Sequence, residues 1–391
     1  METCCILDST SKIFLRTLAL LIALGLSSVA SANLEPEHWV FHFEGQDHKF
    51  KRYDIQRGSP RIDLAEISKA FPVVLGVDSK TGRYSFAHKS ERRVAMFKLG
   101  DTTVSGTYGK ITISQPPMRH DNKILVPIEF GERVVVPLLT GQRPVMPRAP
   151  EAGPVDIVID PGHGGNDWGA YLPQGKYILK EKDVVLILAL RLKEALERLG
   201  VRTALTRDRD YYLSLPERSQ IANAYKPKFF LSLHYNSHAE QKKVRGYELY
   251  VLSMDSSESA AVTAIAKEHQ TIPETSLSAV EESLGRMRAE ANLESSLGWA
   301  EPISRQMHKF LPSFGRPLKM GPFYVLYGAE MPAVLLELGF ITSPEDMEHF
   351  HLFEKQKSLV LALAKALSDK ALPPRPQTTK KPGNDSTQPP Q

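Results

Sequence analysis

Cysteine is scarce in this sequence: the 391 residues include two, Cys4 and Cys5, side by side near the N-terminus. Both fall in a segment that we expect to be removed on export, which would leave the mature chain without a thiol. An exported chain with no disulfide framework must derive its stability from hydrophobic cores. Any metal that it binds would need histidine and carboxylate ligands, because no thiolate would remain.

The N-terminal end also lacks an apolar run long enough for a spanning helix. The run TLALLIALGL follows Lys12 and Arg16 and precedes Ala30-Ser31-Ala32. A basic start, a short apolar run and a small-residue cleavage site are typical of a secretory signal peptide. We predict that residues 1–32 form such a peptide, with an uncleaved anchor as the alternative, and that no membrane span remains after cleavage.

Dense runs of basic residues interleaved with aromatic residues are absent as well, which argues against a nucleic-acid partner. Lysine and arginine total 49 against 45 aspartate and glutamate residues, a formal net charge of +4. This mild positive charge fits weak attraction to an anionic polymer, and it fits solubility alone equally well.

Composition divides the chain into segments. Residues 33–142 hold short runs of strand-forming residues, separated by turn residues and interrupted by one helical stretch, DLAEISKAF. We predict a small β-rich (α+β) accessory domain there, then a proline-rich linker over residues 143–154 and a disordered tail over residues 371–391. The expected strands are HWVFHFEG, RYSFAHK, VAMFKLG, KITISQPP, KILVPIEFG and RVVVPLL.

Residues 155–370 show a different pattern, in which apolar strands alternate with helices. The strand VDIVID leads to the long amphipathic stretch DVVLILALRLKEALERLG, and a last helix is expected to open at Ser343. This alternation predicts a three-layer α/β/α domain with a mostly parallel sheet. In such sheets functional residues gather at the carboxyl ends of the strands.

Three polar residues stand at or near the ends of three such strands. His163 follows VDIVID within PGHGG, His234 ends FFLSLHY, and Glu337 lies inside AVLLELGF. A carboxylate in so apolar a strand is costly unless it is paired, coordinated or protonated. The alternatives are a hydrogen-bonded core histidine and a carboxylate satisfied by arginine or by backbone amides. Glu181 heads the long helix, where an acid is favoured by the helix dipole alone.

Several motifs in order resemble the zinc-dependent N-acetylmuramoyl-L-alanine amidases of the amidase-3 type, over roughly residues 155–368. They are IDPGHGGNDWGA, KEKDV, TRDRDYYLSLPERSQIAN, FFLSLHYNS, RGYELYVLS and MPAVLLELGFITSPED. The stretch SQPPMRHDNKILVPIEFGE resembles the copper-amine-oxidase-like N-terminal domain of bacterial envelope enzymes. No metal-binding constellation accompanies that second stretch, so we expect an accessory or wall-binding role for it.

The first resemblance implies that His163, Glu181 and His234 bind Zn²⁺ and that Glu337 is the catalytic carboxylate. The implied reaction cleaves the amide between N-acetylmuramic acid and L-alanine of the peptidoglycan stem peptide. Tyr235 departs from the small residue that often follows the second histidine, which would alter the pocket wall. Thr342-Ser343 departs from the family's Ser-Asn and would affect only a helix cap.

The resemblance suggests further candidates. Asn236, Arg207 and Arg218 are candidate substrate-binding residues, although both arginines could equally pair with nearby acids. Some members carry a helix that covers the metal until an activator, of the LytM type, displaces it. Candidate residues for such a plug are Glu281, Glu282 and Glu290, for which a solvated helix face is the alternative.

These expectations describe an exported cell-wall hydrolase of the periplasm or envelope, active in peptidoglycan breakdown and cell division. Two rival functions stay open on the sequence. One is a non-catalytic peptidoglycan-binding protein on the amidase fold, and the other is a zinc hydrolase of another N-acylated peptide. A purely structural protein would leave Glu337 unexplained.

Overall fold

The computed structural model describes residues 38–43, 46–53, 61–143, 153–174, 177–238, 243–253 and 279–372. The predicted signal peptide, most of the predicted linker and nearly all of the predicted tail lie outside these residues. Separate hydrophobic cores divide the chain into an N-terminal region, residues 38–143, with one core, and a C-terminal region, residues 153–372, with a core on each face of its sheet.

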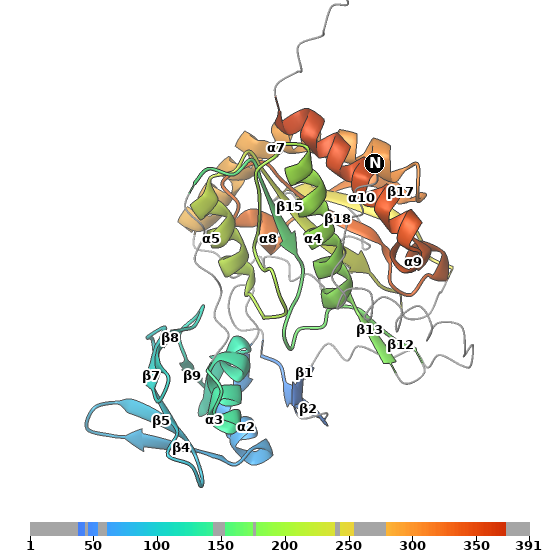
Figure 1. The fold of residues 1–391 in the computed structure, drawn as a ribbon. Helices are drawn as coiled ribbons and strands as arrows, with labels where there is room; N and C mark the ends of the chain where they lie inside the picture. Colours follow the sequence, from blue (N-terminus) through green and yellow to red (C-terminus); the bar gives the residue numbers. More distant parts are fainter. Residues whose placement is uncertain are drawn as a thin grey trace, which may run out of the picture.

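The C-terminal region is built on a six-stranded sheet with the order β14-β11-β15-β18-β16-β17 (Figure 1). Every neighbouring pair is parallel except β16 with β18, so the predicted mostly parallel sheet is confirmed. The strands are β11 (Ile157–Pro161), β14 (Thr203–Leu205), β15 (Phe229–Asn236), β16 (Tyr247–Leu252), β17 (Ser313–Gly321) and β18 (Ala333–Phe340). A separate antiparallel hairpin, β12 (Tyr171–Gln174) and β13 (Tyr177–Lys180), precedes the first long helix and was not predicted.

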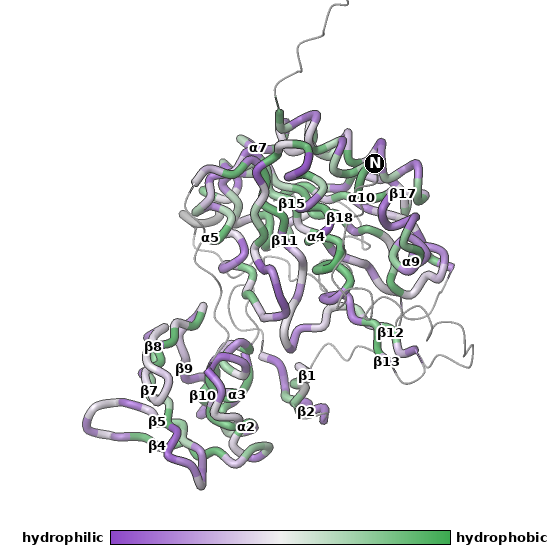
Figure 2. The backbone as a smooth tube through the Cα atoms, in the orientation of Figure 1, coloured by the Kyte–Doolittle hydropathy of each residue, from purple (hydrophilic) through white to green (hydrophobic). Residues whose placement is uncertain are grey.

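Helices cover both faces of this sheet and make the α/β/α arrangement. The helices are α4 (Glu181–Arg198), α5 (Leu215–Tyr225), α7 (Ala279–Met307), α8 (Tyr324–Tyr327), α9 (Pro344–His351) and α10 (Phe353–Ala371). Alternate residues of each strand face opposite layers, as the strand period of two requires. Ile157 and Ile159 of β11 pack with α4, α7 and α10, whereas Val158 packs with α5 and α8. Figure 2 shows these central strands as almost continuously apolar, which is typical of strands buried on both faces.

The N-terminal region is β-rich with short helices, as predicted. Its core joins residues of all three of its sheets, whose orders are β1-β2, β3-β10-β9 and β4-β5-β6-β7-β8. The strands are β1 (His38–Phe43), β2 (Gln46–Lys51), β3 (Arg61–Asp63), β4 (Val73–Asp78), β5 (Arg83–His88), β6 (Val94–Lys98), β7 (Thr103–Gly106), β8 (Gly109–Thr112), β9 (Met118–His120) and β10 (Lys123–Pro127). The predicted helix is present as α2 (Leu64–Ala70), which Asp63 caps through its side chain.

One predicted strand in this region is wrong. RVVVPLL is helical: the π-helix η1 (Gly131–Val135) continues directly into α3 (Val136–Thr140). Its β-branched residues favour a strand locally, but Val134, Val135 and Leu138 bury one helical face in the N-terminal core. Tertiary packing therefore overrides the local propensity. Within the described residues, no helix has the length and apolar character needed to cross a membrane.

Candidate metal centre

The turn after β11 carries His163 at the carboxyl end of the sheet. His163 has a φ of +57°, a left-handed conformation that few non-glycine residues adopt. A Cβ on Gly162 would lie 2.1 Å from Cε1 of His234, and one on Gly169 would lie 2.4 Å from Oε2 of Glu181. The glycines therefore leave room for a second histidine and a carboxylate to close in around His163.

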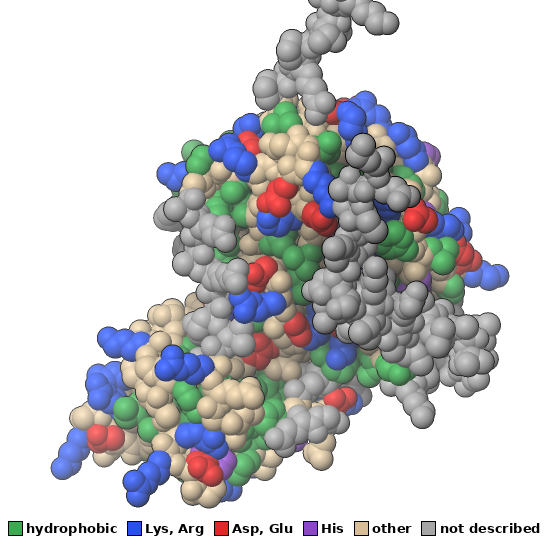
Figure 3. Space-filling model, in the orientation of Figure 1, with side chains coloured by type: hydrophobic (Ala, Val, Ile, Leu, Met, Phe, Trp, Pro, Cys, Tyr) green, Lys and Arg blue, Asp and Glu red, His purple; other side chains and the backbone are tan. Residues whose placement is uncertain are grey.

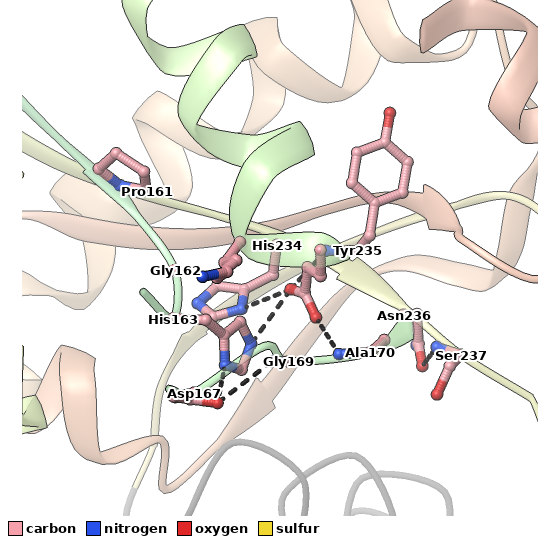
Figure 4. Close-up of polar contacts among 12 residues, drawn as sticks. Pro161, Gly162, His163, Asp167, Gly169, Ala170, His234, Tyr235, Asn236 and Ser237 are labelled. Atoms are coloured by element: carbon pink, nitrogen blue, oxygen red, sulfur yellow. Dashed lines mark hydrogen bonds and ion pairs between the residues drawn. The ribbon is translucent and has the colours of Figure 1, made fainter. Parts of the chain in front are cut away.

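Glu181 is the first residue of α4 and is fully buried. Its Oε2 accepts the Ala170 N–H at 2.7 Å, and its Oε1 accepts the Tyr235 N–H at 2.9 Å. These bonds aim the carboxylate at both histidines, with Oε1 3.0 Å from His234 Nδ1 and 3.2 Å from His163 Nε2 (Figure 4). Glu181 therefore reaches the site, and its place at a helix start is more than a dipole effect.

His234 on β15 and Glu337 on β18 stand opposite each other in register on adjacent parallel strands. The potential ligand atoms of His163, Glu181 and His234 all lie within 4.8 Å of one another, and all three residues are buried. Two imidazoles and one carboxylate are a common protein ligand set of catalytic metal sites. The fold thus brings together three widely spaced residues that could hold a metal ion, with a fourth buried residue, the acid Glu337, beside them.

The charges in this cluster depend strongly on one another. Burial lowers the pKa of His163, but the carboxylates of Asp167 and Glu181 outweigh it and hold that pKa well above its ordinary value. Burial raises the pKa of Glu181, but His163 and His234 outweigh it and hold that pKa well below its usual range. Burial also raises the pKa of Glu337, and there it prevails although His234 opposes it. One acid of the site is therefore stabilised as a carboxylate and the other as an acid that holds its proton.

Asp167 is a residue of this site that the sequence analysis missed. Its Oδ1 lies 3.0 Å from Nδ1 of His163 and also accepts the Gly169 N–H at 3.2 Å. A carboxylate on the outer nitrogen of a ligating histidine fixes which nitrogen faces the metal. The signal was available, because Asp167 lies four residues after His163 inside the same motif.

Arg207 and Arg218, candidate substrate contacts on the sequence, are almost fully buried. Arg207 donates to the carbonyls of Pro161 and Gly162 at 2.9 and 2.7 Å. Arg218 donates to the His163 carbonyl at 2.7 Å and to Asp160 Oδ1 at 2.9 Å. These bonds hold the main chain that leads into the site, and they favour the structural alternative over substrate binding.

Asn236, the third candidate substrate contact, is buried beside a second unrecognised acid. Its Nδ2 donates to Glu248 Oε2 at 2.8 Å, and Lys319 forms an ion pair with Glu248 Oε1. Glu248 stands opposite Glu337 in the antiparallel pairing of β16 with β18. An acid within the apolar run GYELYV is as unusual as Glu337, so the same reasoning from burial could have found it.

The departures at Tyr235 and Thr342-Ser343 have separate outcomes. Tyr235 packs in the hydrophobic core, and its ring points away from the histidines and Glu181 (Figure 4). The expected change in the pocket wall is therefore wrong, because neighbouring strand residues face opposite sides of the sheet. Ser343 accepts the Asp346 N–H at 3.3 Å and caps α9, as predicted.

The candidate plug residues fall on the first half of α7. Glu290 is exposed, in agreement with a solvated helix face. The side chains of Glu281 and Glu282 lie outside the part of the chain that the structure describes.

A family model described as N-acetylmuramoyl-L-alanine amidase matches residues 157–369, more than half of the chain. The chain belongs to this amidase family. The match covers all four residues of the centre, His163, Glu181, His234 and Glu337.

Curated relatives of the chain are also named N-acetylmuramoyl-L-alanine amidase. The chain is 27% identical over 200 residues to the amidase AmiC of Escherichia coli O6:H1, across 49% of this chain and 47% of that relative. It is 26% identical over 230 residues to AmiA of Escherichia coli K12, across 52% of this chain and 78% of that relative. This amidase region therefore spans about half of the one relative and most of the other.

A solved structure is also similar to the amidase region. The amidase AmiC2 of Nostoc punctiforme is 28% identical, with a TM-score of 0.41, across 56% of this chain and 98% of that chain.

Proposed function

We propose that this chain is a zinc-dependent peptidoglycan hydrolase that cleaves the amide between N-acetylmuramic acid and the L-alanine of the stem peptide. The observation that carries the proposal is the buried cluster of His163, Glu181 and His234, with Glu337 in register beside it. Membership of the amidase family supports the choice of this amide as the bond that is cleaved.

The donor atoms of the cluster fit a zinc ion. Two imidazole nitrogens and a carboxylate oxygen favour zinc over magnesium or calcium, which prefer sites made of oxygen ligands alone. Asp167 beside Nδ1 of His163 orients Nε2 toward the centre, as an outer partner of a ligating histidine does. His163, Glu181 and His234 would hold the ion. When bound, zinc supplies a Lewis acid that lowers the pKa of water and polarises the scissile carbonyl.

Glu337 performs the proton transfers in this proposal. Its carboxylate takes a proton from the attacking water, and the resulting acid returns that proton to the alanine nitrogen as the C–N bond breaks. An amine anion is a poor leaving group, so the bond breaks only if the nitrogen receives this proton. The apolar surroundings raise the pKa of Glu337 and favour its protonated form, whereas a zinc ion held beside it would favour the carboxylate that the first transfer needs.

The proposal extends to place and partners. An exported chain acting in the periplasm or cell envelope would meet peptidoglycan directly, in agreement with the signal-peptide pattern of residues 1–32. The N-terminal region would then serve as an accessory or wall-binding part. An activator of the LytM type is a further proposed partner.

A digest of purified peptidoglycan tests the proposed reaction. The chain from residue 33 onward is incubated with and without a chelator, beside Glu337→Ala, and products are identified by mass spectrometry. We expect stem peptides with a free L-alanine amine, lost on chelation, restored by zinc and absent with the variant.

Two results would contradict the proposal in different ways. If the chain binds peptidoglycan but releases no stem peptides, even after a LytM-type activator is added, a non-catalytic binding protein is favoured. If the chain hydrolyses the amide of unrelated N-acyl amino acids but not that of defined muropeptides, another zinc hydrolase is favoured.

A further inference from the structure

Two successive residues of η1 reach out of the N-terminal region to the amidase region. The Glu132 carboxylate accepts the main-chain N–H of Asn166 and, at 3.2 Å, that of Tyr212. Arg133 donates to both carboxylate oxygens of Glu217, at 2.7 and 3.1 Å. Tyr212 belongs to the amidase region, yet its ring packs in the N-terminal core. Figure 3 shows the two regions in direct contact, with side chains of both charges along the junction.

Glu132 binds the turn that directly follows His163 of the candidate metal centre. Gly164 and Asp167 close this turn by exchanging main-chain hydrogen bonds of 2.9 and 3.1 Å, which encloses Asn166 between them. His163 immediately precedes the turn, and Asp167 at its end lies against His163 Nδ1. A shift of the turn would therefore move the carboxylate that orients the histidine.

The amidase region holds this turn at Gly165. Asp210 accepts the Gly165 N–H at 2.6 Å, and Lys182 donates to the Gly165 carbonyl at 2.6 Å. Glu132 supplies the hold on the next residue, Asn166, from the N-terminal region. The approach is so close that a Cβ on Gly165 would lie 2.0 Å from Glu132 Oε1, and Gly165 has a φ of +59°. A glycine at this position is what allows the carboxylate to reach the turn.

The neighbouring Arg133 shows what an ordinary interface bond looks like here. Its partner Glu217 lies at the start of α5, where it completes a capping box with Ser214. That ion pair, between the buried Arg133 and the partly buried Glu217, joins the two regions, and the other hydrogen bonds of Arg133 go to the carbonyls of Thr112 and Tyr212 rather than to the turn. Glu132 and Arg133 thus offer a matched pair: both join the regions, and Glu132 also binds the turn that follows His163.

We propose that Glu132 is a positioning residue of the metal centre, through which the N-terminal region strengthens metal binding by the amidase region. Its carboxylate fixes the turn between His163 and Asp167, so that Asp167 keeps His163 oriented toward the ion. The inference rests on the metal site of the proposed function. It gives the N-terminal region a part in the site itself, beyond any role as a wall-binding accessory.

Metal affinity of the whole mature chain tests this inference. The dissociation constant for zinc is measured by competition with a chromogenic chelator for wild type, Glu132→Gln, Arg133→Met and the exposed control Glu91→Gln. Burial raises the pKa of Glu132 to about 7, so the titration is run at about pH 8.5, where the carboxylate is ionised. Thermal unfolding of the same samples, without added zinc, reports stability separately.

We expect Glu132→Gln to weaken zinc binding about 10-fold, the lower end of the effect for outer partners of metal ligands. Arg133→Met should lower the unfolding temperature while leaving the zinc affinity near that of wild type, and Glu91→Gln should change neither. Equal zinc affinity of folded Glu132→Gln and wild type would overturn the inference. Failure of the proposed zinc site looks different, because wild type itself would then bind no zinc, and the inference would fall with it.

A measurement on the wild type remains decisive if Glu132→Gln does not fold. Hydrogen exchange at the Asn166 amide should be as slow as exchange in β11, because the Glu132 carboxylate holds that N–H. Fast exchange at Asn166 beside slow exchange in β11 would show that Glu132 does not hold the turn, and would overturn the inference.

Discussion

Two clusters of buried polar side chains lie at the same sheet, and they shift the pKa of one buried acid each, Asp160 and Glu337, in opposite directions. The Asp160 cluster comprises Asp160 on β11 with Thr206, Ser232 and Arg218. Asp160 Oδ1 accepts from Thr206 at 2.5 Å and from Arg218 at 2.9 Å, and Oδ2 accepts from Ser232 at 2.9 Å. Burial raises the pKa of Asp160, but Arg218 and the hydroxyl of Thr206 outweigh it, and the pKa ends below its ordinary value.

The strand-end cluster comprises His163, Glu181, His234 and Glu337. Burial raises the pKa of Glu337 well above its ordinary value, and the carboxylates of Glu181 and Glu248 add to the rise. Both Asp160 and Glu337 are fully buried acids on strands of one sheet. Burial alone therefore does not decide whether an acid is held as a carboxylate, whereas the groups around each acid do.

The sharpest test of this difference is Glu337→Gln. The amide cannot move the proton, so we expect kcat to fall about 10³-fold, within the range for a general acid or base. The free energy of unfolding should not fall, because the buried Glu337 gains nothing from being ionised. Steady-state rates on muropeptides and urea unfolding measure the two effects. A rate near that of wild type would remove Glu337 from the chemistry.

The same substitution in the other cluster should show the reverse pattern. Asp160→Asn leaves the buried guanidinium of Arg218 without its partner charge, and we expect a loss of about 3 kcal/mol in the free energy of unfolding. The exposed pair of Asp369 with Lys365 is a matched control, and Asp369→Asn should cost less than about 0.5 kcal/mol. Urea unfolding measures both, and similar costs would mean that the Asp160 cluster is no more structural than a surface pair.

A third substitution tests how tightly the strand-end cluster is packed. In Gly162→Ala the new methyl group would meet the His234 ring at 2.1 Å, so the ring must move. We expect zinc binding about 10-fold weaker, a smaller effect than loss of a ligand would give. Gly298→Ala in α7 is the control, because its new methyl group meets only the flexible end of Lys370. Unchanged zinc affinity in Gly162→Ala would show that the His234 ring can move aside without loss of the metal site.

Much of the amidase region was predictable from sequence because its signals are local. Apolar runs such as FFLSLHY and AVLLELGF mark buried strands, and the capping residues Ser214 and Ser343 mark helix starts. The residues of the centre were predicted from sequence motifs, and in the fold the potential ligand atoms of His163, Glu181 and His234 lie within 4.8 Å of one another. What sequence missed depends on contacts between distant segments. Nothing local to Glu132 indicates that it lies against Asn166, 34 residues away.

The smallest expected effect lies at the other end of β11, where Asp156 offers a third kind of buried acid. It pairs with Arg202 and Lys228, whose side chains are more than half exposed. Burial raises the pKa of Asp156, but hydrogen bonds from both partners outweigh it and lower that pKa to about 2. The carboxylate thus stabilises the fold above its ordinary pKa of 3.8, and this contribution disappears as the pH falls through about 2.

Asp156→Asn should therefore cost about 1 kcal/mol at neutral pH, because water screens the two exposed partners. The difference from wild type should narrow below about pH 4, as the wild-type carboxylate begins to take up a proton. Urea unfolding from about pH 7 to about pH 3 measures it, and added salt should shrink it further. A cost of several kcal/mol that persists at low pH would place Asp156 with Asp160, as an acid held by buried rather than solvated partners. A cost that shrinks with acid and salt would show that Asp156 and Asp160 differ in the solvent exposure of their partners: those of Asp156 are exposed and those of Asp160 are buried.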